Sequence, residues 1–318
     1  MTNNPLKLSV ISPVYGAASV LPELVARIKA SAARITGDYE IILVEDSSPD
    51  DSWEIIKRLA AADRRIIGLS LSRNFGQQYA LNAGLDAATG DWIVTLDCDL
   101  QDEPEHIVDL FNEASKGYDI VFASRVERRD GFIKRSGSRL FCRIMRYLTE
   151  TNLDHSIANF VLYNRKAVAA LAVMGDYYKY YPVLNRWIGF RTAKLPVQHA
   201  GRKGPVRSSY SLKKRLDLAV TTIVTFSDKP LRLVMRFGIS LVAINLVIAF
   251  FLTVRHIVYG EKVSGWLSIF LSLWILSGII IAILGMMGTY MGKMFETVKN
   301  RPRYIVKETT AADHRDEK

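Results

Sequence analysis

The chain has 318 residues, which leaves room for one large domain and a smaller second part. A formal net charge of +10 and a pI near 9.5 indicate an anionic partner: a nucleotide, a phospholipid or a nucleic acid. No nucleic-acid partner is expected, because the sequence has no helix-turn-helix signature and no basic–aromatic module. The two cysteines exclude a disulfide framework and indicate a reducing compartment, and the polar N-terminus predicts no cleaved signal peptide.

Buried strands alternate with helices along the first hundred residues. Apolar runs predict strands over residues 8–12, 40–44, 66–70 and 92–96, the first of them ended by Pro13. Apolar residues at helical spacing predict a helix after each of the first three strands. This alternation predicts an α/β fold with a doubly wound, mostly parallel sheet, whose ligand site lies outside the carboxyl ends of the strands.

Polar clusters stand at the carboxyl ends of all four strands. They are Ser12 with Tyr15, Glu45 with Asp46, Arg73 with Asn74, and Asp97 with Asp99. Burying the last pair without a cation would cost several kcal/mol. Mg²⁺ or Mn²⁺ carrying a diphosphate is a suitable partner, because these ions bind through one or two carboxylates plus substrate phosphates. The alternative is a solvated turn after the strand; the position at a strand end favours the metal.

Two long segments near the C-terminus, residues 237–254 and 263–292, contain no Asp, Glu, Lys or Arg. Each is long enough to cross a hydrocarbon core, which needs roughly 20 residues. A pair of buried soluble helices is disfavoured, because such helices keep a polar face. The pattern predicts a transmembrane hairpin over residues 229–300, with spans near 237–257 and 265–290.

Basic side chains flank this hairpin on both outer sides. By the positive-inside rule, residues 1–228 form a cytoplasmic domain and residues 301–318 a cytoplasmic tail. The predicted location is the cell inner (cytoplasmic) membrane, with a multi-pass topology. Residues 307–318 are polar and charged, which predicts disorder.

Several longer motifs stand at these strand ends and in the C-terminal region. They are Ser12–Tyr15, Val44–Asp50, Ser72–Gln77, Leu96–Glu105, Gly117–Val121 and Arg301–Tyr304. Together they resemble the family-2 glycosyltransferases with the GT-A fold, in particular the membrane-anchored branch that makes polyprenyl-phosphate sugars, alongside dolichol-phosphate mannose synthases. The resemblance covers nearly the whole chain. It implies inverting transfer of one sugar from a UDP- or GDP-sugar to polyprenyl (undecaprenyl) phosphate at the cytoplasmic membrane face.

The same resemblance implies roles for the strand-end residues. Besides Asp97, the residues that would bind the nucleotide sugar are Pro13, Tyr15, Glu45, Asp46 and Asn74. Asp97, Asp99 and Gln101 would hold Mg²⁺ or Mn²⁺, which neutralises the leaving nucleoside diphosphate. For Gln101, solvation of a helix N-terminus before Pro104 is an alternative of similar weight.

The chain departs from the family pattern at three places. Gly16 and Ala17 stand where the family often has Asn-Glu, and Glu45 stands where Asp is usual, a longer arm that would alter contacts to the base. Asn159 stands where many relatives carry the Asp that is the candidate general base. An Asn cannot accept a proton at neutral pH.

The third departure bears on the acceptor. A sugar hydroxyl must lose its proton as it attacks, so it needs a base. A phosphomonoester already carries about −1.5 to −2 charges at pH 7, so it needs positioning and charge screening instead. Asn159 therefore favours a lipid phosphate over a carbohydrate hydroxyl as the acceptor.

Basic residues crowd the segment after the fifth strand, which is predicted near residues 117–121. Three of them are candidates for binding the acceptor phosphate: Arg125, Lys134 and Arg139. By resemblance, Arg125 and Arg139 contact phosphate, and the predicted catalytic residues are these two with Asp97, Asp99 and Asn159. Residues 134–149 predict a basic amphipathic helix at the membrane interface. A solvated helix packed on the core is the alternative.

A second basic segment resembles the loop that closes over the donor diphosphate in relatives. Its candidate nucleotide-sugar ligands are Arg202, Lys203 and Arg207. The Lys of relatives is replaced by Ser209, so either Lys203 or Arg207 supplies that charge. Residues 212–227 then predict a second interfacial helix.

Two other functions compete with lipid-linked sugar transfer. A processive membrane polysaccharide synthase shares the fold, but such enzymes usually carry Gln-x-x-Arg-Trp, and Val183 occupies the Gln position before Arg186 and Trp187. A catalytically inactive nucleotide-sugar-binding membrane protein is the other alternative, and the presence of Asp97, Asp99 and Gln101 argues against it. Association into a homo-oligomer stays open.

Overall fold

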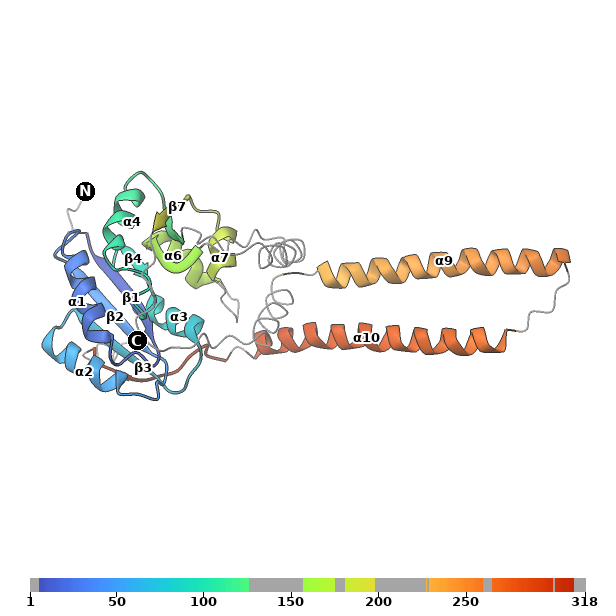
Figure 1. Cartoon of the computed structure of the whole chain (residues 1–318), viewed down its shortest axis with the longest axis horizontal. Coiled ribbons are helices and arrows are strands. Elements are labelled where there is room, and N and C mark those ends of the chain that lie inside the picture. The colour runs from blue at the N-terminus through green and yellow to red at the C-terminus, as the bar shows by residue number, and fades with distance from the viewer. Residues whose placement is uncertain are drawn as a thin grey trace, which may run out of the picture. The chain divides into compact units, whose positions relative to one another are not determined.

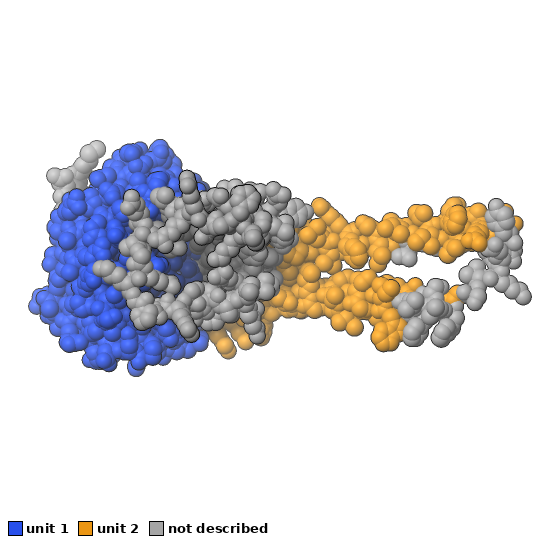
Figure 2. All heavy atoms as spheres, viewed as in Figure 1, with its two compact units in different colours: residues 1–134, 153–209, 302–318 blue, residues 135–152, 210–301 orange. Residues whose placement is uncertain are grey.

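The computed structural model describes residues 6–125, 157–174, 181–197, 227, 229–259, 265–299 and 301–311. The chain divides into two compact units (Figure 2). The first consists of residues 1–134, 153–209 and 302–318, and the second of residues 135–152 and 210–301. Among the described residues, the first unit contains the β-sheet and the second contains two long helices (Figure 1).

The first unit begins with four parallel strands that lie in the order β4-β1-β2-β3. Their bounds are β1 (Leu8–Val14), β2 (Tyr39–Glu45), β3 (Ile66–Leu71) and β4 (Trp92–Thr95). The helices between them are α1 (Leu21–Ala32), α2 (Ser52–Ala62) and α3 (Gln77–Ala87). The predicted alternation of strand and helix, and the mostly parallel sheet, are confirmed.

The second half of the sheet is mixed. Its elements are α4 (His106–Ala114), β5 (Ile120–Arg125), β6 (Ile157–Asn164), α6 (Arg165–Val173), α7 (Tyr181–Trp187) and β7 (Thr192–Val197). Strand β6 is antiparallel to both β4 and β5, while β7 is parallel to β5. The full order is β7-β5-β6-β4-β1-β2-β3-β8. Because β6 runs opposite to β4, the start of β6 lies at the carboxyl edge of the parallel strands.

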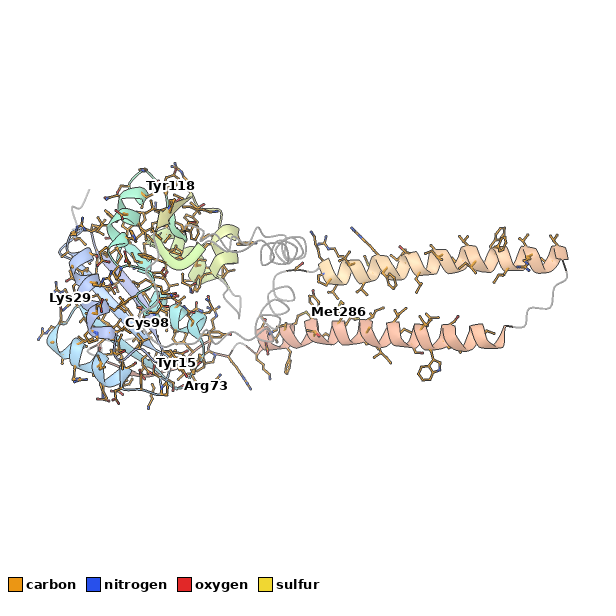
Figure 3. All side chains as sticks on the ribbon, in the orientation of Figure 1. Tyr15, Lys29, Arg73, Cys98, Tyr118 and Met286 are labelled. Carbon is orange, nitrogen blue, oxygen red and sulfur yellow. The ribbon has the colours of Figure 1, made fainter. Side chains whose placement is uncertain are left out.

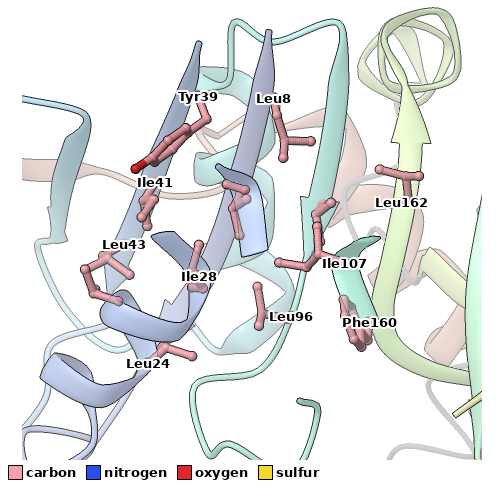
Figure 4. Packing of buried hydrophobic residues seen from close by; sticks show 14 of the residues in the cluster. Leu8, Leu24, Ile28, Tyr39, Ile41, Leu43, Leu96, Ile107, Phe160 and Leu162 are labelled. Carbon is pink, nitrogen blue, oxygen red and sulfur yellow. The ribbon is translucent and has the colours of Figure 1, made fainter. Parts of the chain in front are cut away.

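The core lies where α1 and α4 pack against one face of the sheet (Figure 4). Fully buried side chains from these helices and strands include Leu24, Ile28, Leu43, Ile107 and Phe160. On the opposite face α3 packs close to β1, and a Cβ placed on Gly84 would lie 2.3 Å from Ile11 Cγ2. Glycine at residue 84 therefore permits this close approach of helix and sheet.

The first strand runs past its predicted end at Pro13 and continues to Val14. Ile11 O accepts a hydrogen bond from Leu96 N on the β4 side, and Val14 O accepts one from Asp46 N on the β2 side. Backbone groups alternate between neighbours, so the nitrogen of Pro13 faces the β4 side, where β4 has already ended. The missing N–H therefore leaves no ladder bond broken.

The predicted disorder of residues 307–318 is wrong for the part that the structure describes. Residues Val306–Thr309 form β8, which pairs antiparallel with β3 at the edge of the sheet. Just beyond it, Gly68 N donates to Thr310 Oγ1 at 2.7 Å, and Thr310 N donates to Gly68 O at 3.0 Å. An edge strand satisfies its polar backbone by pairing, which a hydrophobic pattern does not reveal.

The second unit contains α9 (Lys229–Tyr259) and α10 (Trp266–Val298). Within them, Lys229–Leu252 and Ser272–Val298 are long and apolar enough to cross a membrane, with mean hydropathy of 2.2 and 2.0. Their apolar side chains project outward along both helices (Figure 3). These two helices suggest membrane association, while the side of the membrane stays a prediction. The predicted interfacial helices at 134–149 and 212–227 lie outside the described residues.

Candidate active site

The candidate site lies at the carboxyl edge of the parallel sheet, where β2 and β4 end and β6 begins. Asp46 follows β2, Asp97 follows β4 by two residues, and Asn159 is the third residue of β6. Thr95, the last residue of β4, donates its hydroxyl to Asn159 O at 2.7 Å. This contact joins the end of β4 to the start of β6, so Asn159 and the Asp-x-Asp turn lie side by side.

Asp97 is where three elements meet. Its Oδ1 accepts a hydrogen bond from Gln77 Nε2 at 2.6 Å and a longer one from Asn159 Nδ2 at 3.4 Å. Gln77 is the first residue of α3, and Asn159 belongs to β6. The carboxylate is half-buried, and its described hydrogen bonds come from these two side-chain amides.

The turn that carries Asp99 has an unusual backbone. Leu100 has a φ of +56°, in the left-handed region that bulky residues rarely adopt. Its side chain is buried, and Gln101 N donates to Asp99 Oδ1 at 3.1 Å. Such a conformation costs of order 1–3 kcal/mol and persists where the surroundings determine it, as at ligand sites.

Asp46 is buried directly after β2 and accepts hydrogen bonds from the backbone of the loop that follows β3. Its two carboxylate oxygens accept from Phe75 N at 2.7 Å and from Gly76 N at 2.8 Å. Burial raises the pKa of Asp46 above its ordinary value, although these two N–H groups act in the opposite direction. In the same loop, the Arg73 guanidinium lies over the Phe75 ring, 4.3 Å from the ring centroid, in a cation–π contact.

Glu45 is also buried, and its longer arm reaches back into the protein. Its Oε2 accepts from Ser70 Oγ at 2.8 Å, and its Oε1 accepts from Ser48 N. The intervening Ser47 has a φ of +54°. Glu45 thus connects the turn after β2 to β3 through hydrogen bonds, a structural role that the sequence did not predict. The role of Glu45 in nucleotide binding remains a prediction.

Tyr15 and Cys98 flank the site on neighbouring segments; Figure 3 labels both. The Tyr15 side chain is 55% exposed, as a residue that stacks on a ligand requires. Burial raises the pKa of Cys98 to about 11, partly offset by a hydrogen bond from the Tyr15 backbone N–H. The thiol is therefore neutral at pH 7 and is a poor metal ligand or nucleophile.

The structure describes only some of the predicted site residues. Pro13 is buried in β1 and Asn74 is exposed in the loop after β3. Arg125 is the last residue of β5. The remaining predicted cations lie outside the described residues: Lys134, Arg139, Arg202, Lys203 and Arg207.

The donor chemistry of this edge fits the predicted divalent ion. Within the described ranges, no three His, Cys, Asp or Glu side chains gather as a metal site. Mg²⁺ and Mn²⁺ do not require three, because substrate phosphates and water supply the remaining oxygen ligands. Asp97 and Asp99 offer hard carboxylate oxygens on one turn, with the Gln101 side chain two residues further on.

Gln77 is the site residue that sequence reasoning missed. It ends the motif Ser72–Gln77, yet that motif carried no role for it. Its contact with Asp97 joins residues that are 20 positions apart. Only the placement of α3 beside the end of β4 brings them together.

The mixed, mostly parallel sheet, with paired carboxylates where the strands end, agrees with the α/β fold that the motifs predicted. Residues 9–171 match the family model described as glycosyl transferase family 2. The chain belongs to this family, so the predicted family and its enzyme class, a glycosyltransferase with an α/β GT-A fold, are confirmed.

Two curated relatives match along almost their full length. The chain is 32% identical over 312 residues to the glycosyltransferase YkcC of Bacillus subtilis (strain 168), covering 98% of this chain and 96% of the relative. It is 32% identical over 315 residues to the undecaprenyl-phosphate 4-deoxy-4-formamido-L-arabinose transferase of Yersinia pestis (strain Pestoides F), with the same coverage. Among solved structures, the mannosyltransferase PcManGT of Pyrobaculum calidifontis, in complex with GDP-Man and Mn²⁺, is 16% identical with a TM-score of 0.48, covering 95% of this chain and 89% of that one.

Proposed function

We propose that this chain moves one sugar from a nucleotide-sugar donor to undecaprenyl phosphate, with inversion, at the cytoplasmic face of the membrane. The full-length relative from Yersinia pestis acts on undecaprenyl phosphate, as its name states. The two helices that are long and apolar enough to cross a membrane support an acceptor with a lipid tail. The contact between Asn159 and Asp97 is the observation that supports the proposal most directly, because a hydroxyl acceptor would need a base and Asn159 offers an amide beside the proposed metal ligand.

The donor side of the reaction uses the end of β4. Asp97 and Asp99 would hold Mg²⁺ or Mn²⁺ with the donor diphosphate, and Gln101 stands beside them. When bound, the ion would screen the charge that develops on the leaving nucleoside diphosphate. Tyr15 offers an exposed ring to the base, and Asp46 shapes the loop of Arg73 and Asn74.

The acceptor side follows from proton chemistry. The Asn159 amide cannot take a proton, and Glu45 and Asp46, two acidic side chains of this edge, already accept bonds from the protein. A phosphomonoester attacks without losing a proton, because its second pKa is near 6. The acceptor phosphate oxygen then forms a bond to the anomeric carbon as the bond to the diphosphate breaks.

Cations complete the proposed acceptor site. Arg125, at the end of β5, would bind the lipid phosphate together with Lys134 and Arg139. Arg202 and either Lys203 or Arg207 would cover the donor diphosphate. These assignments extend the family resemblance to the positions of this chain.

A transfer assay with the purified full-length protein in detergent tests the proposal. The protein is incubated with Mn²⁺, undecaprenyl phosphate and each of a panel of UDP- and GDP-sugars, and lipid products are identified by mass spectrometry. The expected product carries one sugar on the lipid phosphate. A polymer would indicate a processive synthase, transfer to hydroxyls alone would contradict the role of Asn159, and no turnover of any donor would indicate an inactive binding protein.

Asn159→Asp sharpens the same assay. The substitution restores a carboxylate beside Asp97, so it supplies the base that a hydroxyl acceptor needs. We expect transfer to lipid phosphate to persist and transfer to a free sugar hydroxyl to appear. Wild-type transfer to hydroxyls as fast as that of Asn159→Asp would show that the amide does not select the acceptor.

A further inference from the structure

We infer that Gln77 is a positioning residue that orients the Asp97 carboxylate for the metal–diphosphate group. This inference rests on the proposed function, in which Asp97 is a metal ligand. Its basis is the hydrogen bond from Gln77 Nε2 to Asp97 Oδ1, at 2.6 Å. Outer partners of this kind fix the orientation of metal-binding carboxylates in proteins.

Gln77 is the stronger of the two amide contacts to that oxygen. The other donor, Asn159 Nδ2, lies at 3.4 Å, near the limit for a hydrogen bond. A charge-assisted contact at 2.6 Å is short and strong, because the acceptor is ionised. Of these two described contacts, the one from Gln77 therefore constrains the Asp97 carboxylate more strongly.

The backbone around Gln77 is held firmly, so the amide approaches Asp97 from a fixed point. Gly76, which precedes it, has a φ of +99° and donates its N–H to Asp46. Gly76 O in turn accepts from Tyr79 N at 3.0 Å and from Ala80 N at 3.2 Å, which begins α3. Asp46 thus fixes the start of the helix, and the helix presents Gln77 to Asp97.

This arrangement connects two predicted sites through described contacts. The chain of bonds runs from the Asp46 carboxylate through the Gly76 N–H to the start of α3, and from Gln77 to Asp97. Asp46 lies at the end of β2 and Asp97 beyond the end of β4, which are separated in the sheet by β1. The start of helix α3 therefore links the two strand-end carboxylates through hydrogen bonds, in addition to the pairing of their strands in the sheet.

The side chain of Gln77 can be changed without disturbing the core. It is exposed at the first position of α3, whereas the residues of α3 that pack on the sheet are buried, among them Ala80, Leu81 and Leu85. Exposed substitutions away from special backbone features usually change stability by less than about 0.5 kcal/mol. A loss of metal binding in a Gln77 variant would therefore report on Asp97.

Gln77→Met tests the inference, since it keeps the length of the side chain and removes the donor. Gln78→Met is the control, the same change one residue further along α3 at a half-buried side chain whose Oε1 accepts no described hydrogen bond. Mn²⁺ binding to the full-length protein in detergent is measured by electron paramagnetic resonance in the presence of UDP, and separately of GDP, with thermal unfolding recorded alongside. We expect Gln77→Met to weaken Mn²⁺ binding about tenfold or more, because losing an outer partner typically costs 10–100-fold.

Activity gives a second readout. Raising Mn²⁺ to saturation should restore the turnover of Gln77→Met toward the wild-type value, while Gln78→Met should match the wild type at all concentrations. A drop in unfolding temperature that parallels the loss of Mn²⁺ would show a structural role and overturn the inference. Wild-type Mn²⁺ affinity in Gln77→Met would overturn it too.

Asp99→Asn separates this inference from the proposed function. If Asp99→Asn loses Mn²⁺ binding and Gln77→Met does not, the positioning role fails and the metal site stands. If the wild type binds Mn²⁺ no better than Asp99→Asn in the presence of either nucleotide, the metal site itself fails and both proposals fall.

Discussion

Strand β2 carries a buried carboxylate near each of its ends, and the two are used in different ways. Glu40 lies at the amino edge of the sheet and is 6% exposed, while Asp46 follows the carboxyl end and is 3% exposed. The two side chains are buried to a similar extent, so their exposed fractions do not distinguish them. Their hydrogen-bond partners do.

Glu40 belongs to a network that is complete within the protein. Its oxygens accept from Ser9 Oγ at 2.6 Å and from the backbone and hydroxyl of Thr89, and Lys7 Nζ lies 3.3 Å away. Burial raises the pKa of Glu40, but these donors outweigh it, so the net pKa lies below the ordinary value. Gly90 allows the close fit, because a Cβ there would lie 2.6 Å from Ser9 Oγ.

Asp46 has a raised pKa, because burial outweighs the two backbone N–H groups that it accepts from. The same edge holds the two left-handed non-glycine residues of the described chain, Ser47 and Leu100. Strained backbone and poorly compensated carboxylates concentrate where a protein binds ligands. The carboxylate at the amino edge is therefore satisfied within the protein, whereas the carboxyl edge has the strain and the raised pKa that support the binding site we propose there.

The largest expected effect comes from Asp99→Asn, which changes only the carboxyl edge of the sheet. Asp99→Asn removes a proposed metal ligand, whose ion contributes several kcal/mol to the transition state. Since each 1.36 kcal/mol is a factor of ten, we expect kcat/KM for sugar transfer to fall roughly 100-fold or more. The unfolding temperature should stay close to the wild-type value. Activity within a factor of three of the wild type would contradict the site.

The second largest expected effect comes from Glu40→Gln, which changes only the amino edge of the sheet. Glu40→Gln leaves the donors of Ser9 and Thr89 incompletely paired and Lys7 without its carboxylate partner, which should cost about 1–3 kcal/mol of unfolding free energy. Thermal unfolding in detergent measures the loss, and activity per folded molecule should be unchanged. Glu54→Gln is the control, because its pair with Lys57 is exposed and screened by solvent, so its unfolding temperature should fall less than that of Glu40→Gln.

The pH dependence of stability sharpens this comparison. Because the folded pKa of Glu40 is depressed, its contribution is fully present above its ordinary pKa of about 4.3 and is lost as the pH falls through the folded value. The stability gap between wild type and Glu40→Gln should therefore narrow at acid pH. Asp46 has a raised pKa, so the wild type should gain relative to Asp46→Asn as the pH falls through that value. If the stability of the wild type relative to Glu40→Gln and relative to Asp46→Asn changed in the same direction with pH, the distinction between the two edges would be refuted.

Only part of this difference between the two edges of the sheet could be predicted from the sequence. Apolar runs that alternate with amphipathic helices predict a parallel sheet and hence which residues share its carboxyl edge. They do not predict partners: the Asp46–Gly76 and Gln77–Asp97 contacts depend on where α3 begins, and the Glu45–Ser70 contact depends on side-chain reach. Pro13 extends its strand because β4 ends early, which only the register shows.

The C-terminal segment shows the same limit. Composition predicts disorder over residues 307–318, because this stretch is polar and charged. Instead, the backbone of β8 finds partners on the open edge of β3, and Trp53 Nε1 donates to Glu308 Oε2 at 2.9 Å. Further back, Tyr304 OH donates to Asp86 Oδ2 at 2.8 Å. Polar residues thus hold a segment that hydrophobicity leaves unassigned.

The smallest expected effect concerns this strand. Thr310→Val removes the hydroxyl that accepts from Gly68 N, which should cost about 1 kcal/mol of unfolding free energy. For a unit of this size the corresponding fall in unfolding temperature is about 2–4 °C. Thr309→Val is the matched control, because the Thr309 hydroxyl accepts only from Ala311 N among its described hydrogen bonds, within the same segment. Its unfolding temperature should fall less.

The steady-state kinetics of Thr310→Val test whether β8 supports only the stability of the sheet or also the proposed binding site at its carboxyl edge. The strand pairs with β3, whose carboxyl end leads into the Arg73–Gly76 loop, yet the described bond to Gly68 lies in the middle of β3. We therefore expect unchanged KM values for donor and lipid, and unchanged Mn²⁺ dependence. A raised donor KM in Thr310→Val but not in Thr309→Val would mean that β8 supports the loop held by Asp46, and so belongs with the binding edge.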